Sequence, residues 1–427
     1  MHIAFVDSTP APLEAIARAR DEGHLVSFIE SSDPSYLPTP ENVRLIERAD
    51  RIVRDVATTD TAAVTAALAE CHAWKPVDFA VSQNEMAVEA VARSCKALGL
   101  RGTSPDGVLT ARRKDLLRAA LRDAGLACPA FAVAQDADEA LAAADAIGYP
   151  VIVKPPSGAD SRLAALARDR AEVRAACAQI LGGGLDTLPA AWRAQYARGL
   201  LVEEYLRGPL ISVEIGMRNG RGYVFCVSGR TRARDDEVIE IGPHIPAELP
   251  AGQERDCVAY AESVCRAIGL DMGVFHLEMI VSARGPVLVE ANPRIMGGIM
   301  PTVYAHAAGR SIYSGFLQVI SGTSVDCARP RFDGCVTGRR FFARTDAALP
   351  ESCDTSWLAP YHDQLIRFDP PAALGLRPRE KVRAGQVVAR MISRGADYAA
   401  TAKAGVQIAG LIAKSWEISP LYGEYDM

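Results

Sequence analysis

The sequence lacks the features that would place it at once in several common classes of protein. Its ten cysteines form no C-x-x-C pair and no zinc-ligand spacing, so we expect reduced, mostly buried thiols. No apolar run approaches the roughly 18 residues that span a bilayer, and no basic segment precedes the short apolar run at residues 2–6. These absences predict a cytoplasmic protein with neither a signal peptide nor a membrane partner.

An excess of positive charge is also absent. The chain has 47 Lys and Arg against 52 Asp and Glu, a net charge of −5, which argues against general affinity for nucleic acid. Hydrophobic residues make up 49% of the chain and charged residues 23%, as in ordinary globular proteins. At 427 residues the chain is too long for one core, so we expect roughly two to four subdomains.

Apolar strands and helical patterns alternate through the first hundred residues. Strand-like runs lie at residues 2–7, 25–31, 49–55 and 77–83, with helical patterns at 12–23, 61–74 and 84–99. This βαβ rhythm predicts an α/β protein that begins with a parallel sheet flanked by helices. No G-x-G-x-x-G motif follows the first strand, so the expected Rossmann-like domain lacks the loop that binds a dinucleotide.

The rest of the chain changes its pattern twice. A helical segment at 104–125 precedes a strand–turn–strand at 149–169, a loop or helix at 185–199 and a strand at 200–206. From residue 212 strands dominate, at 212–219, 222–233, 274–282 and 286–291, which indicates an antiparallel sheet. The last hundred residues combine strands at 334–343 and 386–393 with a helix at 397–416.

Two acids are expected to lie side by side on neighbouring strands. A hairpin centred on Arg284 would place Glu278 directly opposite Glu290, with Asn292 two positions further on the same face. Like charges in this arrangement are destabilising, and apolar neighbours on that face make bare carboxylates costlier. Mg²⁺, which takes carboxylate oxygens together with substrate phosphates, would resolve the conflict. The alternatives are two acids on a solvated face or a shared proton.

Arg294 and a glycine pair follow the acids. Arg294 stands two residues beyond Asn292 and cannot help the metal, but its planar guanidinium can hold a phosphate or an oxyanion. Gly297 and Gly298 would let the backbone offer amides to a carboxylate, although a plain turn explains them nearly as well. His276, two residues before the first acid, either orients a ligand or is a buried core histidine.

Lysines and an acidic strand end indicate a nucleotide site. Lys154 ends a strand and precedes a turn of small residues, a position from which it can reach phosphates. Lys114 lies in a helical segment rich in cations, and for both lysines a solvated surface position is the alternative. At the end of the strand at 200–206, Glu203 could accept a hydrogen bond from an adenine amino group, and Leu206 could offer a backbone contact.

In this order the motifs resemble those of the ATP-grasp superfamily. The order is Lys114, Lys154, VEEYL, SVEIG, HLEM and VEANPR, and it covers about residues 105–325. The most specific element is E-x-N-P-R with a glutamate twelve residues upstream. The resemblance implies a Rossmann-like domain at 1–105, the two halves of an ATP-grasp fold at 106–206 and 207–325, and a small C-terminal α+β domain at 326–427.

The resemblance also implies roles for individual residues. Lys154 and Arg294 would be catalytic. ATP would be bound by Lys114, Lys154, Ser157, Gly158, Glu203, Glu204, Tyr205, Leu206 and Glu214. Mg²⁺, with Mn²⁺ as a substitute, would be bound by Glu278, Glu290 and Asn292. Substrate would be bound by Arg294, Gly297, Gly298, His276 and Arg232, the last from a segment at 229–250 that otherwise reads as a basic solvated strand edge.

Two departures from the family pattern concern the nucleotide. Leu210 stands where the family often has an acid for the ribose hydroxyls, so we expect Glu214 or water to hold the ribose. The loop at 155–161, usually glycine-rich, has a single glycine, which leaves its hold on the β- and γ-phosphates open.

The chemistry implied by the resemblance is carboxylate activation. ATP-grasp members transfer the γ-phosphate to a carboxylate, and an amine then attacks the acylphosphate to give an amide, ADP and phosphate. The segment at 292–304 looks most like that of L-amino-acid ligases, so small carboxylate and amine substrates and, by family habit, a homodimer are expected. The alternatives are a bicarbonate-dependent carboxylase, a purine-pathway enzyme, and a nucleotide-binding regulator without catalysis.

Overall fold

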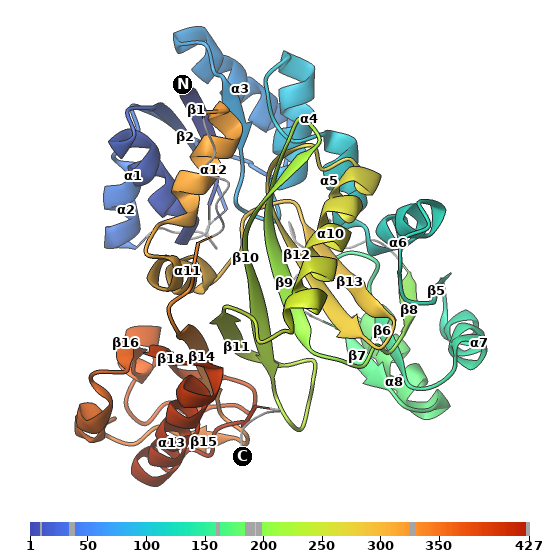
Figure 1. The fold of residues 1–427 in the computed structure, drawn as a ribbon, viewed down its shortest axis with the longest axis vertical. Coiled ribbons are helices and arrows are strands. Elements are labelled where there is room, and N and C mark those ends of the chain that lie inside the picture. The colour runs from blue at the N-terminus through green and yellow to red at the C-terminus, as the bar shows by residue number, and fades with distance from the viewer. Residues whose placement is uncertain are drawn as a thin grey trace.

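Three sheets of four or more strands organise the chain (Figure 1). The computed structural model describes residues 1–8, 11–33, 39–158, 163–183, 193, 199–323 and 330–423. A four-stranded sheet forms the N-terminal part, a second four-stranded sheet forms a smaller unit, and an eight-stranded sheet includes the C-terminal strands. The mixed α/β fold of the sequence prediction is confirmed.

The N-terminal sheet is parallel, as the βαβ pattern predicts. Its strands are β1 (His2–Val6), β2 (Leu25–Ser31), β3 (Arg51–Val56) and β4 (Phe79–Val81), in the order β3-β2-β1-β4. Its helices are α1 (Glu14–Asp21), which follows the 3₁₀ turn η1 (Ala11–Leu13), α2 (Pro40–Ile46), α3 (Thr61–Trp74) and α4 (Val88–Leu98). The sequence patterns miss α2, although Pro40 stands in its first turn and the Thr39 side chain accepts a hydrogen bond from the Asn42 amide.

The helical segment predicted at 104–125 is two helices, α5 (Pro105–Arg112) and α6 (Lys114–Asp123). Arg113 between them is extended, with φ −102° and ψ 100°, so the helical hydrogen-bond pattern stops there. The amide of Lys114 instead donates to the carbonyl of Pro156 at 2.7 Å. The break makes Lys114 the first residue of a helix that is tied to the small-residue turn after Lys154.

The smaller unit is an antiparallel sheet with two helices. Its strands are β5 (Phe131–Ala134), β6 (Val151–Lys154), β7 (Ala165–Ala167) and β8 (Leu200–Glu204), in the order β5-β8-β6-β7, and its helices are α7 (Ala137–Ile147) and α8 (Arg170–Leu181). The predicted strand–turn–strand is confirmed by the pairing of β6 with β7. The segment predicted as a loop or helix at 185–199 lies outside the described residues, apart from 193 and 199.

The large sheet has the order β13-β12-β9-β10-β11-β14-β18-β16, and its described pairs are antiparallel. The strands are β9 (Leu210–Arg218), β10 (Arg221–Arg232), β11 (Glu240–Ile245), β12 (Met272–Ser282), β13 (Gly285–Asn292), β14 (Cys335–Phe342), β16 (Leu365–Asp369) and β18 (Val387–Gly395). Four helices accompany it: α10 (Ala251–Ile268), α11 (Met300–Ala308), α12 (Ile312–Ser321) and α13 (Tyr398–Trp416). The remaining short elements are β15 (Ala347–Ala348), β17 (Lys381–Val382), η4 (Ser356–Tyr361) and η5 (Pro371–Leu374).

The two faces of the large sheet carry different side chains. One row across the strands contains Met279, Ile211, Gly229, His244 and Thr337. The row beside it contains Glu290, Glu278, Ser212 and Ser228. Met279 and Ile211 pack with Val264 of α10, so we call their side the α10 face and the opposite side the acid face.

Helices α11 and α13 lie on opposite faces of the sheet. The hydroxyl of Thr337, in the row of the α10 face, donates to the Thr401 hydroxyl of α13 at 2.7 Å. Val336, one residue earlier, packs in one cluster with Val303 of α11. The α10 face is therefore covered by α10 and α13, and part of the acid face by α11.

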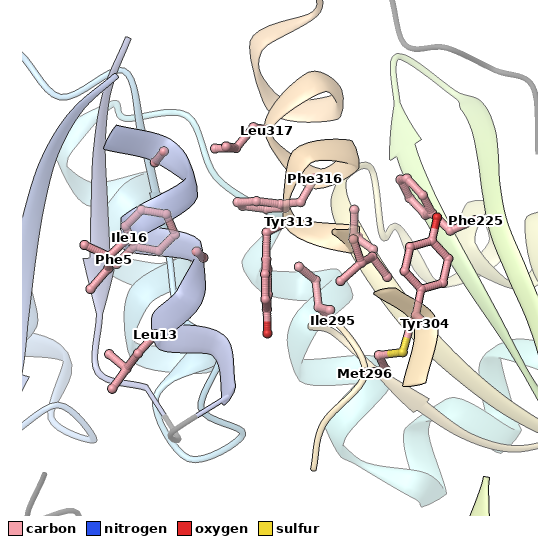
Figure 2. Packing of buried hydrophobic residues seen from close by; sticks show 14 of the residues in the cluster. Phe5, Leu13, Ile16, Phe225, Ile295, Met296, Tyr304, Tyr313, Phe316 and Leu317 are labelled. Atoms are coloured by element: carbon pink, nitrogen blue, oxygen red, sulfur yellow. The ribbon is translucent and has the colours of Figure 1, made fainter. Parts of the chain in front are cut away.

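The largest core joins the N-terminal sheet to the large sheet (Figure 2). Phe5 and Ile16 lie on one side of it, and Tyr313 and Phe316 of α12 lie opposite. The rings of Phe79 on β4 and Phe316 meet edge to face, with centroids 6.3 Å apart. Figure 2 also shows Tyr304, Phe225, Ile295 and Met296 continuing the same core toward β10. The segment after Arg294 is thus held against the N-terminal part.

The described cysteines are reduced, as the sequence pattern predicts. The nine described cysteines are free thiols, and seven of them are buried. Within the described residues no helix has both the length and the apolar character that crossing a membrane requires.

We expect Phe316→Ala to lower stability by about 3–5 kcal/mol, because it removes a fully buried ring from the core shared by two sheets. Thermal unfolding followed by circular dichroism checks this. Leu181→Ala, at a side chain that is 48% exposed, is the control and should change little. Equal midpoints for the two variants would contradict the role given to this core.

Candidate functional site

The predicted pairing of Glu278 with Glu290 is confirmed, but the hairpin reaches it differently. The turn consists of Ala283 and Arg284 alone, because Ser282 pairs with Gly285. That tighter turn would place Val289 opposite Glu278, but a β-bulge between Glu278 and Met279 shifts the register by one residue. The bulge therefore brings the two carboxylates face to face.

Each acid has its own cationic partner, so the pair is not bare. The ammonium of Lys114 lies 2.7 Å from Glu290 Oε1 and also donates to the carbonyl of Gly158 at 3.2 Å. Glu278 Oε1 lies 2.8 Å from His276 Nε2 and 3.7 Å from Arg230 Nη2. Cationic side chains of the protein thus offset the repulsion between the two acids, whereas the sequence pattern predicts that a metal alone would neutralise it.

His276 connects the acids to a fully buried carboxylate. Its Nδ1 bonds to Glu214, which is 0% exposed. Burial alone would lower the pKa of His276, but the carboxylates of Glu214 and Glu278 outweigh it and raise the pKa to about 9. At neutral pH the imidazolium can donate to both acids. Glu214 therefore lies beneath His276, which differs from the expectation that it holds a ribose.

The oxygen ligands proposed for Mg²⁺ share one face of the hairpin. Glu278 pairs with Glu290, and Asn292 pairs with His276 two positions along. Two carboxylates and an amide oxygen are hard ligands of the kind Mg²⁺ takes alongside substrate phosphates. Among the described residues no cluster of three or more His, Cys, Asp or Glu side chains could hold a metal alone. The donor set therefore fits a cation shared with a phosphate ligand, and poorly fits a metal caged by protein.

Lys154 and Glu203 form a buried ionic group with a residue that the sequence patterns miss. Lys154 Nζ lies 2.5 Å from one oxygen of Glu203, and Arg118 Nε donates to the other at 2.7 Å. Burial would raise the pKa of Glu203, but Arg118 and Lys154 lower it to about 2. Arg118 stands one helical turn after Lys114 in α6, a spacing that would have placed both side chains on one face.

These side chains line a cleft of about 200 Å³ between the smaller unit and the acid face. Among the residues predicted for nucleotide or metal, the lining includes Lys114, Lys154, Ser157, Gly158, Glu203, Glu204, Tyr205, Leu206, Glu278 and Glu290. Leu210 also lines it, at the position where the family pattern has an acid. The structure thus brings together in one cleft residues that are as far apart in the sequence as Lys114 and Glu290.

Glu204 and Tyr205, at the end of β8, bond to side chains of two hairpins. Glu204 accepts from Arg284 Nη2 at 2.8 and 2.9 Å, which joins it to the β12–β13 turn. The Tyr205 hydroxyl donates to Glu237, and Arg232 Nη1 lies 3.2 Å from the same carboxylate. Arg232 lines the same cleft, and its contact with substrate stays a prediction.

Arg294 is held by an acid from the N-terminal part that the sequence patterns also miss. Arg294 Nε donates to Glu85 at 2.8 Å, and Arg112 Nε lies 3.6 Å from the same carboxylate. Burial would raise the pKa of Glu85, but the charges of these arginines and of Lys114 lower it. Gln83 accepts a hydrogen bond from the Ile295 amide at 3.1 Å. Gln83 and Glu85, which both follow β4, therefore fix the segment around Arg294.

The glycine pair lies beside Arg294. A Cβ at Gly297 would stand 3.3 Å from Arg294 Nη1, closer than most side chains approach one another. Gly298 has φ +59°, a left-handed conformation that glycine adopts without strain. Both positions thus let the chain turn tightly under the guanidinium into α11. Whether their amides bind a ligand stays a prediction.

The buried ionic group of Glu203 with Lys154 and Arg118 should make stability depend on pH in the acid range. Because the pKa of Glu203 falls from 4.5 to about 2 on folding, its contribution is complete above pH 4.5 and declines as the pH drops toward 2. That contribution is on the order of 3 kcal/mol. We expect Glu203→Gln to lower the melting temperature at pH 7 and to remove this part of the slope between pH 5 and pH 3.

Glu204→Gln is the matched control, because the neighbouring carboxylate is half-exposed and pairs with an exposed arginine. Its melting curve should keep the acid slope of the unchanged protein. If Glu203→Gln kept that slope as well, the buried ionic group would not be its source.

Comparison with known proteins assigns part of the chain to a family. Residues 147–303 match the ATP-grasp domain. The chain is 29% identical over 299 residues to carnosine synthase 1 of Gallus gallus, covering 66% of this chain and 30% of that protein. It is 26% identical over 235 residues to alanine–anticapsin ligase of Bacillus amyloliquefaciens, covering 52% and 49%. The chain thus spans half or less of the length of these two curated relatives.

A solved structure has the same fold over nearly the whole chain. The L-amino acid ligase of Bacillus licheniformis superposes with a TM-score of 0.76 and 17% identity, covering 99% of this chain and 98% of that one. At this identity the likeness concerns the fold. It covers the N-terminal and C-terminal parts that flank the matched domain as well.

Proposed function

Because the chain carries an ATP-grasp domain, we propose that it is an ATP-dependent ligase that joins a carboxylate to an amine, both of them amino acids or molecules of that kind. The γ-phosphate would pass to a carboxylate oxygen of the first substrate, with ADP as the leaving group. The amine of the second substrate would then attack the acyl carbon and expel phosphate, leaving an amide bond.

The observation that carries the proposal is the position of Arg294. It follows the hairpin of the acid pair, and its Nε is held at 2.8 Å from Glu85. Burial would raise the pKa of Glu278, but the positive charges of His276, Arg230 and, last, Arg294 lower it to about 2. A guanidinium held there can neutralise an oxyanion or a transferring phosphate.

The other side chains of the cleft have complementary roles in the proposal. Lys114 and Lys154 would bind the ATP phosphates, exchanging their present contacts with Glu290 and Glu203. Glu278, Glu290 and Asn292 would hold Mg²⁺, which when bound neutralises charge on the β- and γ-phosphates. The cleft beside Leu206 would hold the adenine. We find no need for a side-chain nucleophile, because phosphoryl transfer depends mainly on positioning and charge neutralisation.

The relatives support amino-acid substrates. One of them is by name a ligase that acts on alanine, an amino acid. The solved structure with the same fold is by name an L-amino acid ligase, which supports the architecture required. The identities of the two substrates are left to experiment.

A survey of substrate pairs tests the proposal. Purified protein would be incubated with ATP and Mg²⁺ against pairs of amino acids, with phosphate, the nucleotide product and product mass measured together. ADP and phosphate that appear only with particular pairs, alongside a condensed mass, are the expected result. Turnover with bicarbonate or a purine precursor alone would assign the protein to the carboxylase branch. ATP binding without turnover on any substrate would favour a regulator.

Changing one acid of the pair separates catalysis from binding. We expect Glu290→Gln to lower ADP formation more than about 100-fold, because it removes a proposed metal ligand and the partner of Lys114. The Mg²⁺ concentration for half-maximal rate should rise. Glu262→Gln, on the opposite face of the sheet in α10, is the control and should leave the rate unchanged. Equal rates in the two variants would remove Glu290 from the site.

Glu85 is expected to act through Arg294. Glu85→Gln should lower the rate about tenfold, since Arg294 loses the charged partner that fixes its guanidinium. In the double variant Glu85→Gln with Arg294→Gln, the loss should be no larger than in Arg294→Gln alone, because the two residues form one unit. Glu89→Gln, four residues further along the chain in α4, is the control. Losses that multiply in the double variant would show that Glu85 acts independently.

A further inference from the structure

A second, larger cavity lies behind the acid face. It has a volume of about 780 Å³, within the range of small-molecule pockets. Its lining comes from the start of β9, from β10 and β11, and from the first half of α13. It shares Leu210 with the nucleotide cleft and no other lining residue, so one strand separates the two spaces.

The cavity opens on the α10 face of the large sheet. Ile211, Gly229 and His244 form one row across β9, β10 and β11, and this row continues to Met279 and Thr337. The acid row containing Glu278 is the adjacent row, whose side chains point to the other face. The sheet therefore lies between this cavity and the acid pair, and Arg230, which lines the cavity, also reaches Glu278 at 3.7 Å.

The floor of the cavity depends on a glycine and a histidine. A Cβ at Gly229 would stand 2.0 Å from His244 Nε2, so only glycine leaves room for the imidazole. The ring stacks on Tyr398 with centroids 4.0 Å apart, and the Tyr398 hydroxyl lies 2.5 Å from Thr231 Oγ1. Burial, and then Arg230, lower the pKa of His244 to about 3, so the ring is neutral. The floor therefore combines an uncharged aromatic stack, which favours an apolar ligand body, with the buried guanidinium of Arg230, which also lines the cavity.

The walls and the rim differ in character. Ile211, Ala402 and Val406 present apolar side chains, and the rim carries an acid, Glu248, and a base, Lys403, both exposed. An apolar body with one positive and one negative end would complement this lining. Two opposite charges on the rim would fit an ammonium group and a carboxylate better than either charge alone.

We propose that this cavity is a second ligand site, which binds an apolar zwitterion of the size of an amino acid or a short peptide. The ammonium would lie toward Glu248, the carboxylate toward Lys403, and the apolar side chain against Ala402 and the His244–Tyr398 stack. Because the sheet separates the site from the acids, its ligand is not a reactant and should be recovered unchanged. The proposal does not depend on which reaction the front cleft performs.

Binding measured without ATP or Mg²⁺ tests the proposal. Isothermal titration calorimetry would use L-phenylalanine and L-leucyl-L-phenylalanine, which distinguish a single amino acid from a peptide. The expected dissociation constant is about 1 mM or tighter for at least one of them. 3-Phenylpropionate and phenethylamine, each with one charge only, should bind at least about tenfold more weakly, equivalent to 1.4 kcal/mol. Equal affinity for all four probes, or no binding of either zwitterion, would overturn the proposal.

Three variants assign the binding to a face of the sheet. Ala402→Trp fills the cavity, and Lys403→Glu reverses the rim charge at an exposed position that folding should tolerate. Both should weaken zwitterion binding at least about tenfold, while Arg294→Gln, in the front cleft, should leave it unchanged. Binding lost in Arg294→Gln and retained in both cavity variants would place the ligand in the front cleft and overturn the proposal. Failure of the ligase assay would leave these binding results unaffected.

Discussion

Two carboxylates facing each other across adjacent strands are the constraint around which the cleft is built. Glu278 and Glu290 could not share this position without cations, because the repulsion of like charges opposite one another is unfavourable. The fold supplies the cations from two directions. Lys114 reaches Glu290 from the start of α6, and His276 and Arg230 reach Glu278 from the sheet. A ligand that brings its own cation would therefore displace contacts that already exist.

The position of Lys114 depends in turn on local backbone features. The extended conformation of Arg113 ends α5 and lets the Lys114 amide bond to Pro156 in the turn after β6. That turn ends the strand of Lys154, whose ammonium and Arg118 share Glu203. Ionic contacts between side chains that line one cleft thus join the smaller unit to the acid face. The break between α5 and α6 therefore positions Lys114, the cation that pairs with Glu290.

The sequence could predict features that depend on local pattern. Strand alternation and a short turn were enough to place Glu278 beside Glu290, although a tighter turn and a bulge produce that pairing instead of a symmetric hairpin. Two partners could not be predicted this way. Arg118 and Glu203 are 85 residues apart, and Arg294 and Glu85 are 209 apart, so only the folded chain brings them together. The family resemblance leads to the expectation that Glu214 or water holds the ribose, whereas the folded chain buries Glu214 fully beside His276.

The proposed transfer of phosphate to a carboxylate oxygen is tested most directly with oxygen-18. A carboxylate substrate labelled in both oxygens would be used with ATP, Mg²⁺ and the amine, and the released phosphate analysed by mass. An acylphosphate places one labelled oxygen in the phosphate, because the amine expels that oxygen together with phosphorus. The account predicts one labelled oxygen per phosphate, with ADP as the other product. Unlabelled phosphate, or AMP with the label, would contradict it.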